Sequence, residues 1–138
     1  MQKMAANPSV EAAVAKLGLG HYQRHVFLCL GPTCCPDAIG LAAWDALKAE
    51  LKNAGLGNAC QRTKADCLRV CVDGPTLVVY PEGTWYRGMT AERIPRFVRE
   101  HIVAGQPIDE WIFARNPLSH NAPTDAPKPG GCQPPAAG

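Results

Sequence analysis

The sequence has 138 residues, 46% of them hydrophobic, and this size favours one domain with a single core of ordinary extent. Charged residues make up 19% of the chain, and the formal net charge of +2 is too small and too scattered for a nucleic-acid-binding surface. The apolar runs are far shorter than the ~20 residues that cross a bilayer, and the N-terminus lacks the apolar core of a secretory signal. We therefore expect a soluble cytoplasmic protein that binds neither nucleic acid nor a membrane.

The first half of the chain predicts a helix, a strand, a helix and a second strand. Residues 10–17 are rich in alanine and predict two or three helical turns, and residues 24–29 predict a central, buried strand. Pro36 suits the first position of a helix that ends near residue 53. The apolar face of this helix is expected to carry Leu41, Trp44, Leu47 and Leu51. Residues 58–63, with Cys60 among them, predict a strand parallel to the first, because a helix lies between the two.

The second half predicts a hairpin followed by a helix. Residues 76–80 form the most convincing strand pattern, and residues 84–89 return as its antiparallel neighbour. Thr90 suits the N-cap of a second helix, in which Pro95 predicts a bend. The apolar face of this helix is expected to carry Ile94, Phe97, Val98, His101 and Ile102, with His101 as a core histidine.

The composition divides the chain into three parts. Residues 1–22 are interpreted as an N-terminal extension and residues 23–115 as the folded domain. Residues 116–138 contain six of the thirteen prolines and few apolar side chains, which predicts a flexible tail because too little surface can be buried. Cys132, isolated in that tail, is interpreted as a bystander.

The cysteines carry the functional signal. Seven cysteines in a reducing compartment favour metal binding or redox chemistry over a disulfide framework. The candidate ligands form two pairs, Cys29-x4-Cys34 and Cys67-x3-Cys71, each on a loop beside a predicted strand. If the two strands are neighbours in one sheet, four thiolates can enclose a [2Fe–2S] cluster, with one iron bound by each pair. Backbone N–H groups could then bond to the sulfurs, inside an apolar collar of Leu28, Leu30, Leu68, Val70 and Val72.

Two other functions fit the same cysteines in part. Both gaps lie in or at the edge of the range for structural zinc, so a zinc-stabilised interaction module remains an alternative. No C-x-x-C occurs in the chain, and the vicinal pair Cys34-Cys35 suits an ordinary disulfide poorly. A thiol-disulfide oxidoreductase is therefore disfavoured.

The second cysteine pair is followed by Gly74-Pro75, an apolar strand, Tyr80-Pro81 and Trp85-Tyr86. This layout resembles the thioredoxin-like [2Fe–2S] ferredoxins, and it is similar to the 24-kDa-type iron–sulfur subunit of respiratory NADH dehydrogenase. The resemblance covers residues 25–111. It implies an α/β, thioredoxin-like fold in which a small mixed sheet is packed by two helices. It also implies a one-electron carrier without enzymatic activity, often a homodimer, whose partners are a donor reductase and an acceptor enzyme.

Carried over by position, the resemblance implies that the cluster ligands are Cys29, Cys34, Cys67 and Cys71. The stand-alone ferredoxins of this family usually have a longer loop between their first two ligands, so both Cys34 and Cys35 are candidates here. Cys34 is favoured as the ligand, because Pro36 should begin the helix and Cys35 then lies at the cap side of that helix. A subunit of a larger oxidoreductase, sharing the same cluster, is a further alternative.

Overall fold

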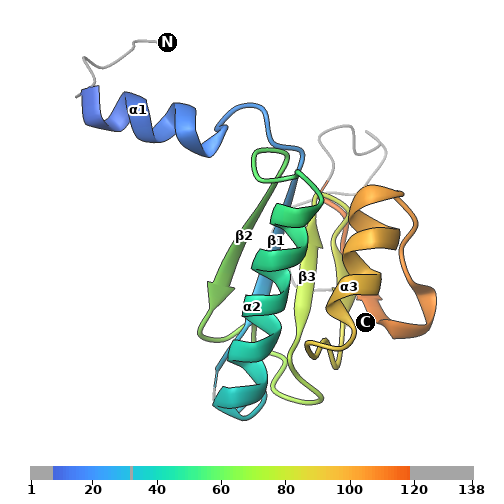
Figure 1. The fold of residues 1–138 in the computed structure, drawn as a ribbon. Helices are drawn as coiled ribbons and strands as arrows, with labels where there is room; N and C mark the ends of the chain where they lie inside the picture. Colours follow the sequence, from blue (N-terminus) through green and yellow to red (C-terminus); the bar gives the residue numbers. More distant parts are fainter. Residues whose placement is uncertain (1–7, 32, 119–138) are drawn as a thin grey trace, which may run out of the picture.

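The computed structural model describes residues 8–31 and 33–118, which form a five-stranded mixed sheet with the order β2-β1-β3-β4-β5 (Figure 1). The strands are β1 (Arg24–Cys29), β2 (Cys60–Ala65), β3 (Leu77–Tyr80), β4 (Thr84–Tyr86) and β5 (Ile112–Arg115). Strand β1 pairs in parallel with β2 and antiparallel with β3, and the remaining pairs are antiparallel. The predicted α/β class and the central place of the first strand are therefore confirmed.

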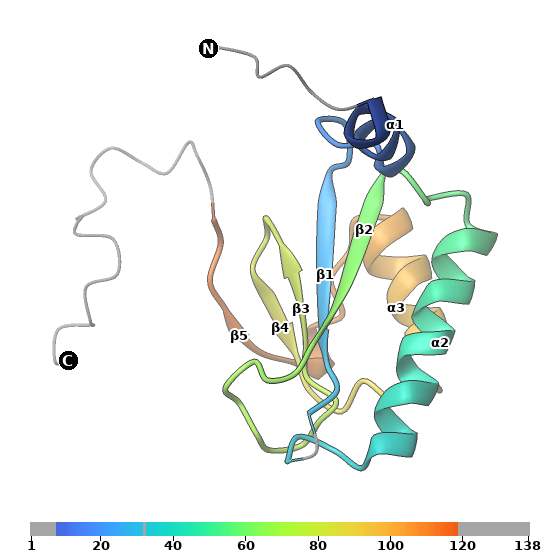
Figure 2. The same cartoon turned by 90° about the vertical axis from the view of Figure 1, so that its left-hand side faces the viewer.

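Two helical segments cover the same face of this sheet (Figures 1 and 2). They are α2 (Asp37–Asn53) and α3 (Ile94–Phe97), the latter continuing into the π-helical turn η1 (Val98–Val103). A short 3₁₀ turn, η2 (Asp109–Trp111), precedes β5. The predicted N-terminal helix is present as α1 (Pro8–Leu17), which buries none of its residues. No helix within residues 8–31 and 33–118 is long and apolar enough to span a membrane.

The core lies between the sheet and the helical segments α2 and α3–η1. The strand period of two residues and the helix period of 3.6 residues explain which side chains enter it. On β1, Val26 and Leu28 alternate inward and are both fully buried. The buried stripe of α2 consists of Gly40, Ala43, Trp44, Leu47 and Leu51. Leu41 was expected on that stripe, but its side chain is 50% exposed, because the stripe passes through residue 40 instead. Pro36 is the N-cap of α2 rather than its first residue, which corrects the predicted start by one position.

The last helix begins later than the sequence predicts. Arg93 is its N-cap, so the predicted cap at Thr90 is wrong. Pro95 consequently lies in the first turn, where a missing N–H costs no hydrogen bond, and the predicted bend is not needed. The helix instead widens into η1. All the residues expected on its apolar face are buried: Ile94, Phe97, Val98, His101 and Ile102.

The strand limits differ from the predicted ones at three places. Strand β2 covers 60–65 rather than 58–63, and β4 ends at Tyr86 rather than at residue 89. Strand β5 was not predicted; it pairs with β4 across a register shift. Beyond β5, the backbone N–H of Asn116 donates to the carbonyl of Gly83 at 2.7 Å. Residues 119–138 of the predicted tail, Cys132 among them, lie outside the described residues.

Candidate metal centre

Both cysteine loops leave the sheet at the same end, which is the lower end in Figure 1. Cys29 is the last residue of β1 and lies opposite Ala65, the last residue of β2. Its backbone N–H donates to the carbonyl of Thr76, just before β3, at 2.9 Å. The N–H of Leu30 donates to the carbonyl of Ala65 at 2.8 Å. The parallel and antiparallel neighbours of β1 thus bring the loop 29–36 against the loop 66–76.

Two glycines allow these loops to touch at the backbone. A Cβ atom on Gly31 would collide with the carbonyl oxygen of Asp66 in the second loop. A Cβ atom on Gly74 would collide with both the Sγ and the carbonyl oxygen of Cys34 in the first loop. The N–H of Gly74 donates to that same carbonyl at 3.1 Å. Only glycine fits at either position, a requirement that the sequence signals by placing a Gly-Pro pair beside each cysteine pair.

Cys29 and Cys34 lie together, joined by a side-chain hydrogen bond. Burial raises the pKa of the Cys29 thiol, and the neighbouring Cys34 raises this pKa further. The backbone N–H groups of Gly31 and Leu68, which donate to the Cys29 sulfur, lower the pKa. Because Leu68 belongs to the second loop, the sulfur of Cys29 already receives a donor from the opposite cysteine segment. This contact joins the first cysteine pair to the backbone immediately beside Cys67.

Cys34 and Cys35 face different surroundings. The Sγ of Cys34 lies 3.7 Å from the hydroxyl of Thr76, which in turn donates to the carbonyl of Val70 at 3.4 Å. The Sγ of Cys35 instead lies 3.2 Å from the place of a Cβ on Gly40, against α2. Burial raises the pKa of Cys35, and the nearby Cys34 and Cys29 raise it further. Cys34 therefore faces the second cysteine loop, whereas Cys35 packs on the helix.

Cys67 and Cys71 are exposed on the second loop. Arg69 adopts a left-handed backbone conformation with φ of 72°, and its N–H donates to the Sγ of Cys67 at 3.2 Å. The N–H of Gly88 donates to the carbonyl of Asp73 at 2.6 Å and holds the far side of the loop. Across the described ranges, no three His, Cys, Asp or Glu side chains are gathered as a metal site. The structure thus unites Cys29 with Cys34, and it places Cys67 and Cys71 on the adjoining loop without drawing their side chains in.

Cys60 lies away from the two cysteine loops, and the predicted collar is only partly buried. Cys60 is paired with Arg24 at the opposite end of β1, and burial raises the pKa of its thiol to about 11. Leu28 is part of the core, whereas the remaining collar residues Leu30, Leu68 and Val70 are half-buried. The side chain of Val72 is 66% exposed, so the collar prediction is wrong for this residue.

The donor set suits an iron–sulfur cluster. Such clusters are bound by cysteine thiolates, and their potentials depend on hydrogen bonds to the sulfurs. Here backbone N–H groups already donate to the sulfurs of Cys29 and Cys67. When bound, the cluster supplies a site that takes up and releases one electron. The residues present would hold it between the two loops, with the second cysteine pair on the solvent side.

Comparison with known proteins leads to the same chemistry. No known protein-family profile matches the chain. The chain is 31% identical over 101 residues to the "Putative 2Fe-2S ferredoxin" of Priestia megaterium, which covers 73% of this chain and 78% of that relative. It is 32% identical over 53 residues to the protein "Ferredoxin, 2Fe-2S" of Aquifex aeolicus, covering 38% of this chain and 48% of that relative.

The fold leads to the same group of proteins. The crystallised thioredoxin-like [2Fe–2S] ferredoxin from Aquifex aeolicus aligns with a TM-score of 0.63 at 24% identity, covering 70% of this chain and 94% of that one. The predicted thioredoxin-like fold is therefore confirmed. The relatives also favour the iron–sulfur cofactor over the zinc alternative. From the sequence match and the fold together, the chain belongs to the thioredoxin-like [2Fe–2S] ferredoxins and is an electron carrier whose cofactor is a [2Fe–2S] cluster.

Proposed function

We propose that Cys29, Cys34, Cys67 and Cys71 bind the cluster, and that the protein passes single electrons between partner proteins without catalysing a reaction of its own. The observation that carries this proposal is the backbone contact between the two cysteine loops at Gly31 and Gly74. Four sulfurs from two loops can hold a shared cluster only if the loops meet, and these glycines make the approach close.

The ligand assignment is tested by single serine substitutions in the protein purified without oxygen. Cys67→Ser and Cys71→Ser should each lose or severely weaken the visible charge-transfer bands and the EPR signal of the reduced protein. Iron and sulfide assays should give about two of each per chain in the native protein. Cys60→Ser is the matched control, because Cys60 is buried at the opposite end of β1. The visible and EPR spectra of this variant should match those of the native protein.

The choice between the vicinal cysteines has a test of its own. The side chain of Cys34 faces Thr76 and the second loop, whereas that of Cys35 faces Gly40 of α2. Cys34→Ser should therefore abolish the cluster and Cys35→Ser should retain it. The reverse result would transfer the ligand role to Cys35 and leave the rest of the set in place.

The partners are proposed to be a donor reductase and an acceptor enzyme. The formal net charge of +2 is small, so long-range steering contributes little and docking should depend weakly on salt. A fixed stoichiometric complex with flavin- or quinone-linked subunits on affinity purification would instead make the chain a subunit of a larger oxidoreductase. The cytoplasm is the proposed compartment, because the six described cysteines are all free thiols.

A homodimer built on the uncovered face of the sheet is also proposed. Opposite α2, an aromatic row runs across this face, with His25 stacked on Phe27 at 4.4 Å between ring centroids and Tyr80 beside Phe27 at 6.3 Å. Half-buried aromatic side chains of this kind commonly form interfaces. Light scattering should give a dimer for the native chain and a monomer for Phe27→Lys.

Residues 23–115 are the proposed domain, flanked by extensions at 1–22 and 116–138.

A further inference from the structure

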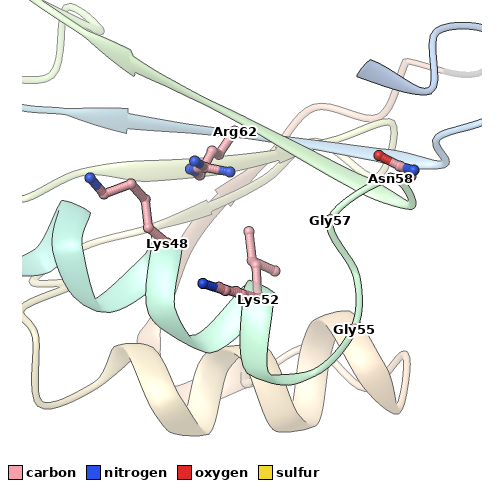
Figure 3. Close-up of a pocket in the computed structure, with 7 residues that line it drawn as sticks. Lys48, Lys52, Gly55, Gly57, Asn58 and Arg62 are labelled. Carbon is pink, nitrogen blue, oxygen red and sulfur yellow. The ribbon is translucent and has the colours of Figure 1, made fainter. Parts of the chain in front are cut away.

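A pocket of about 590 Å³ lies between the C-terminal half of α2 and the start of β2 (Figure 3). Its volume falls within the range of about 300–1,000 Å³ that is usual for small-molecule sites. The helix α2 begins beside Cys35 and reaches the pocket at Lys48, so at 1.5 Å per residue the two sites are roughly 20 Å apart. This pocket is therefore separate from the cysteine loops.

Three cations line the pocket. Lys48 and Lys52 are one turn apart on the same side of α2, and Arg62 enters from β2 (Figure 3). No carboxylate is among the lining residues. Lys48 does pair with Asp45 at 3.6 Å, but both side chains are largely exposed, and a pair of this kind is weak. Within the described part of the chain, Lys52 and Arg62 have no ion-pair partner, so the positive charge of the pocket is not balanced internally.

Arg62 has a buried hydrogen-bond donor without an acceptor in residues 8–31 and 33–118. Its Nε is buried and has no hydrogen-bond partner among the residues that the structure describes. Its guanidinium carbon lies 5.5 Å from the centroid of the Trp44 ring, a cation–π contact that stabilises the charge. A buried unpaired donor carries a desolvation penalty, and a shift of the Arg62 side chain toward an anionic oxygen in the pocket would relieve it.

The remaining wall leaves room for a ligand. A Cβ atom added to Gly55 or Gly57 would meet no heavy atom within 4 Å, so this side of the pocket is open and the backbone is accessible. Asn58 contributes an amide to the rim, and the buried Leu51 forms an apolar floor. The pocket thus offers space for more than the charged part of a ligand.

We propose that this pocket binds a free phosphorylated small molecule with at least two phosphate groups, in the size range of a nucleoside diphosphate. A diphosphate can satisfy several cations at once, and the planar guanidinium of Arg62 matches two phosphate oxygens in a bidentate pair. A single carboxylate would leave most of the charge unpaired. The proposal does not depend on which cysteines bind the cluster.

The test titrates the oxidised, cluster-containing protein with inorganic pyrophosphate and with ADP, followed by calorimetry and by the NMR signal of the Arg62 Nε–H group. Binding should be saturable, and the Nε–H signal should shift because its proton gains an acceptor. Arg62→Gln should weaken binding at least about ten-fold, and Lys52→Gln several-fold. Lys64→Gln is the matched control: Lys64 lies on the same strand and its Nζ is 5.7 Å from the same Trp44 ring, but it does not line the pocket.

A steric variant distinguishes binding inside the pocket from a general attraction of anions to the positive charge. Gly57→Gln places a side chain in the open wall without changing the charge, and it should block ADP while the visible spectrum of the cluster stays unchanged. The proposal is overturned if neither probe gives saturable binding, or if Lys64→Gln weakens binding as much as Arg62→Gln. It is equally overturned if a glutamate-rich peptide or anionic lipid vesicles bind at this face while pyrophosphate and ADP do not.

Discussion

Thr76 contacts both cysteine loops through a single hydroxyl group. Its Oγ1 lies 3.7 Å from the sulfur of Cys34 and donates to the carbonyl of Val70 at 3.4 Å, and the residue is fully buried. Once Cys34 is a thiolate it no longer donates to this hydroxyl, and the hydroxyl can turn its one proton from the carbonyl of Val70 to the sulfur. A hydrogen bond to a ligand sulfur stabilises the more negative, reduced form and so raises the reduction potential.

Thr76→Val removes the hydroxyl and nearly preserves the volume. We expect the reduction potential to fall by tens of millivolts, on the order of what one net hydrogen bond of about 1 kcal/mol corresponds to for a one-electron couple. Protein-film voltammetry measures the shift, and Thr33→Val, on the exposed side of the first loop, serves as the control. An unchanged potential with full cluster content would mean that Thr76 only fills space.

Gly74 is one of the two positions where the contact between the loops leaves no room for a side chain. A Cβ atom there would collide with the sulfur and the carbonyl oxygen of Cys34, and neither can move freely because both belong to a buried residue. Gly74→Ala should therefore reduce iron and sulfide content per chain to well below that of the native protein. Gly57→Ala is the control, since its Cβ would meet nothing within 4 Å, and equal iron content in both variants would contradict the argument.

At the scale of elements, a buried polar network ties η1 to the sheet. The hydroxyl of Tyr86 accepts from the N–H of Ile108 at 3.0 Å and donates to the Nδ1 of His101 at 2.7 Å. The Nε2 of His101 then donates to the Oε2 of Glu82 at 3.2 Å, and the Nε of Arg24 donates to the same oxygen at 2.7 Å. Each hydrogen bond fixes the donor and acceptor of the next one, so the network specifies a neutral histidine and an ionised glutamate. The prediction that His101 is a satisfied core histidine is confirmed.

This network predicts that the protein loses stability on acidification. Burial lowers the pKa of His101, against the opposing pull of Glu82. Burial alone would raise the pKa of Glu82, but its hydrogen bonds from Arg24 and His101 outweigh that and the pKa is lowered. Both groups therefore bind protons more readily when unfolded, so their stabilisation is complete above the ordinary pKa values and declines as the pH falls.

The free energy of unfolding, measured with urea, should drop by up to about 1 kcal/mol between about pH 7.5 and about pH 6, where an unfolded histidine titrates. A further drop should begin near the ordinary glutamate pKa of 4.5. His101→Gln should flatten the upper part of this dependence. Some slope should remain, because burial also lowers the pKa of His25. A full slope in His101→Gln would assign the effect to other groups.

The sequence predicted the elements whose residues carry a strong local pattern. The apolar run of β1 and the apolar stripe of α2 are set by side chains that recur at the strand or helix period. Strand β5 carries no such pattern: it has four residues, three of them exposed, and it exists because β4 offers a free edge. The start of α3 was misplaced because Thr90 is a good cap by type, while Pro95 suits the first turn and so determines where the helix begins.

The chemistry of the candidate site was predictable from the sequence, but the residues that hold the two cysteine loops together were not. The spacing of the cysteines and the family resemblance indicated the loops, and the sheet order explains why they meet. The roles of Gly31, Gly74 and Thr76 depend on contacts between segments more than thirty residues apart in the sequence, and no local pattern reports such contacts. The same holds for the pocket, whose cations come from α2 and β2 and converge only in the folded chain.

At the scale of the whole molecule, the cysteine loops lie at the edge of the hydrophobic core. The core cluster is made of residues from the sheet, α2, α3 and η1, together with Met89 and Ile108. Cys29, Cys34 and Cys35 are buried but are not part of this cluster, and Leu30 of the first loop packs against it. Its stability comes from apolar burial, which does not require the cluster. In this respect we expect the protein to differ from small zinc domains, which unfold when the metal is removed.

Removing the cluster with a chelator under oxidising conditions, followed by reduction of the thiols, should therefore leave most of the far-UV circular dichroism signal in place. Amide hydrogen exchange should accelerate in residues 29–36 and 66–76, which lose their crosslink, while Leu28, Leu47 and Val79 in the core keep their protection. Cys60→Ser provides a control that carries the cluster but has one fewer core thiol. Uniform loss of protection across β1, α2 and β3 would instead show that the cluster holds the whole fold together, and that the core alone contributes too little to maintain it.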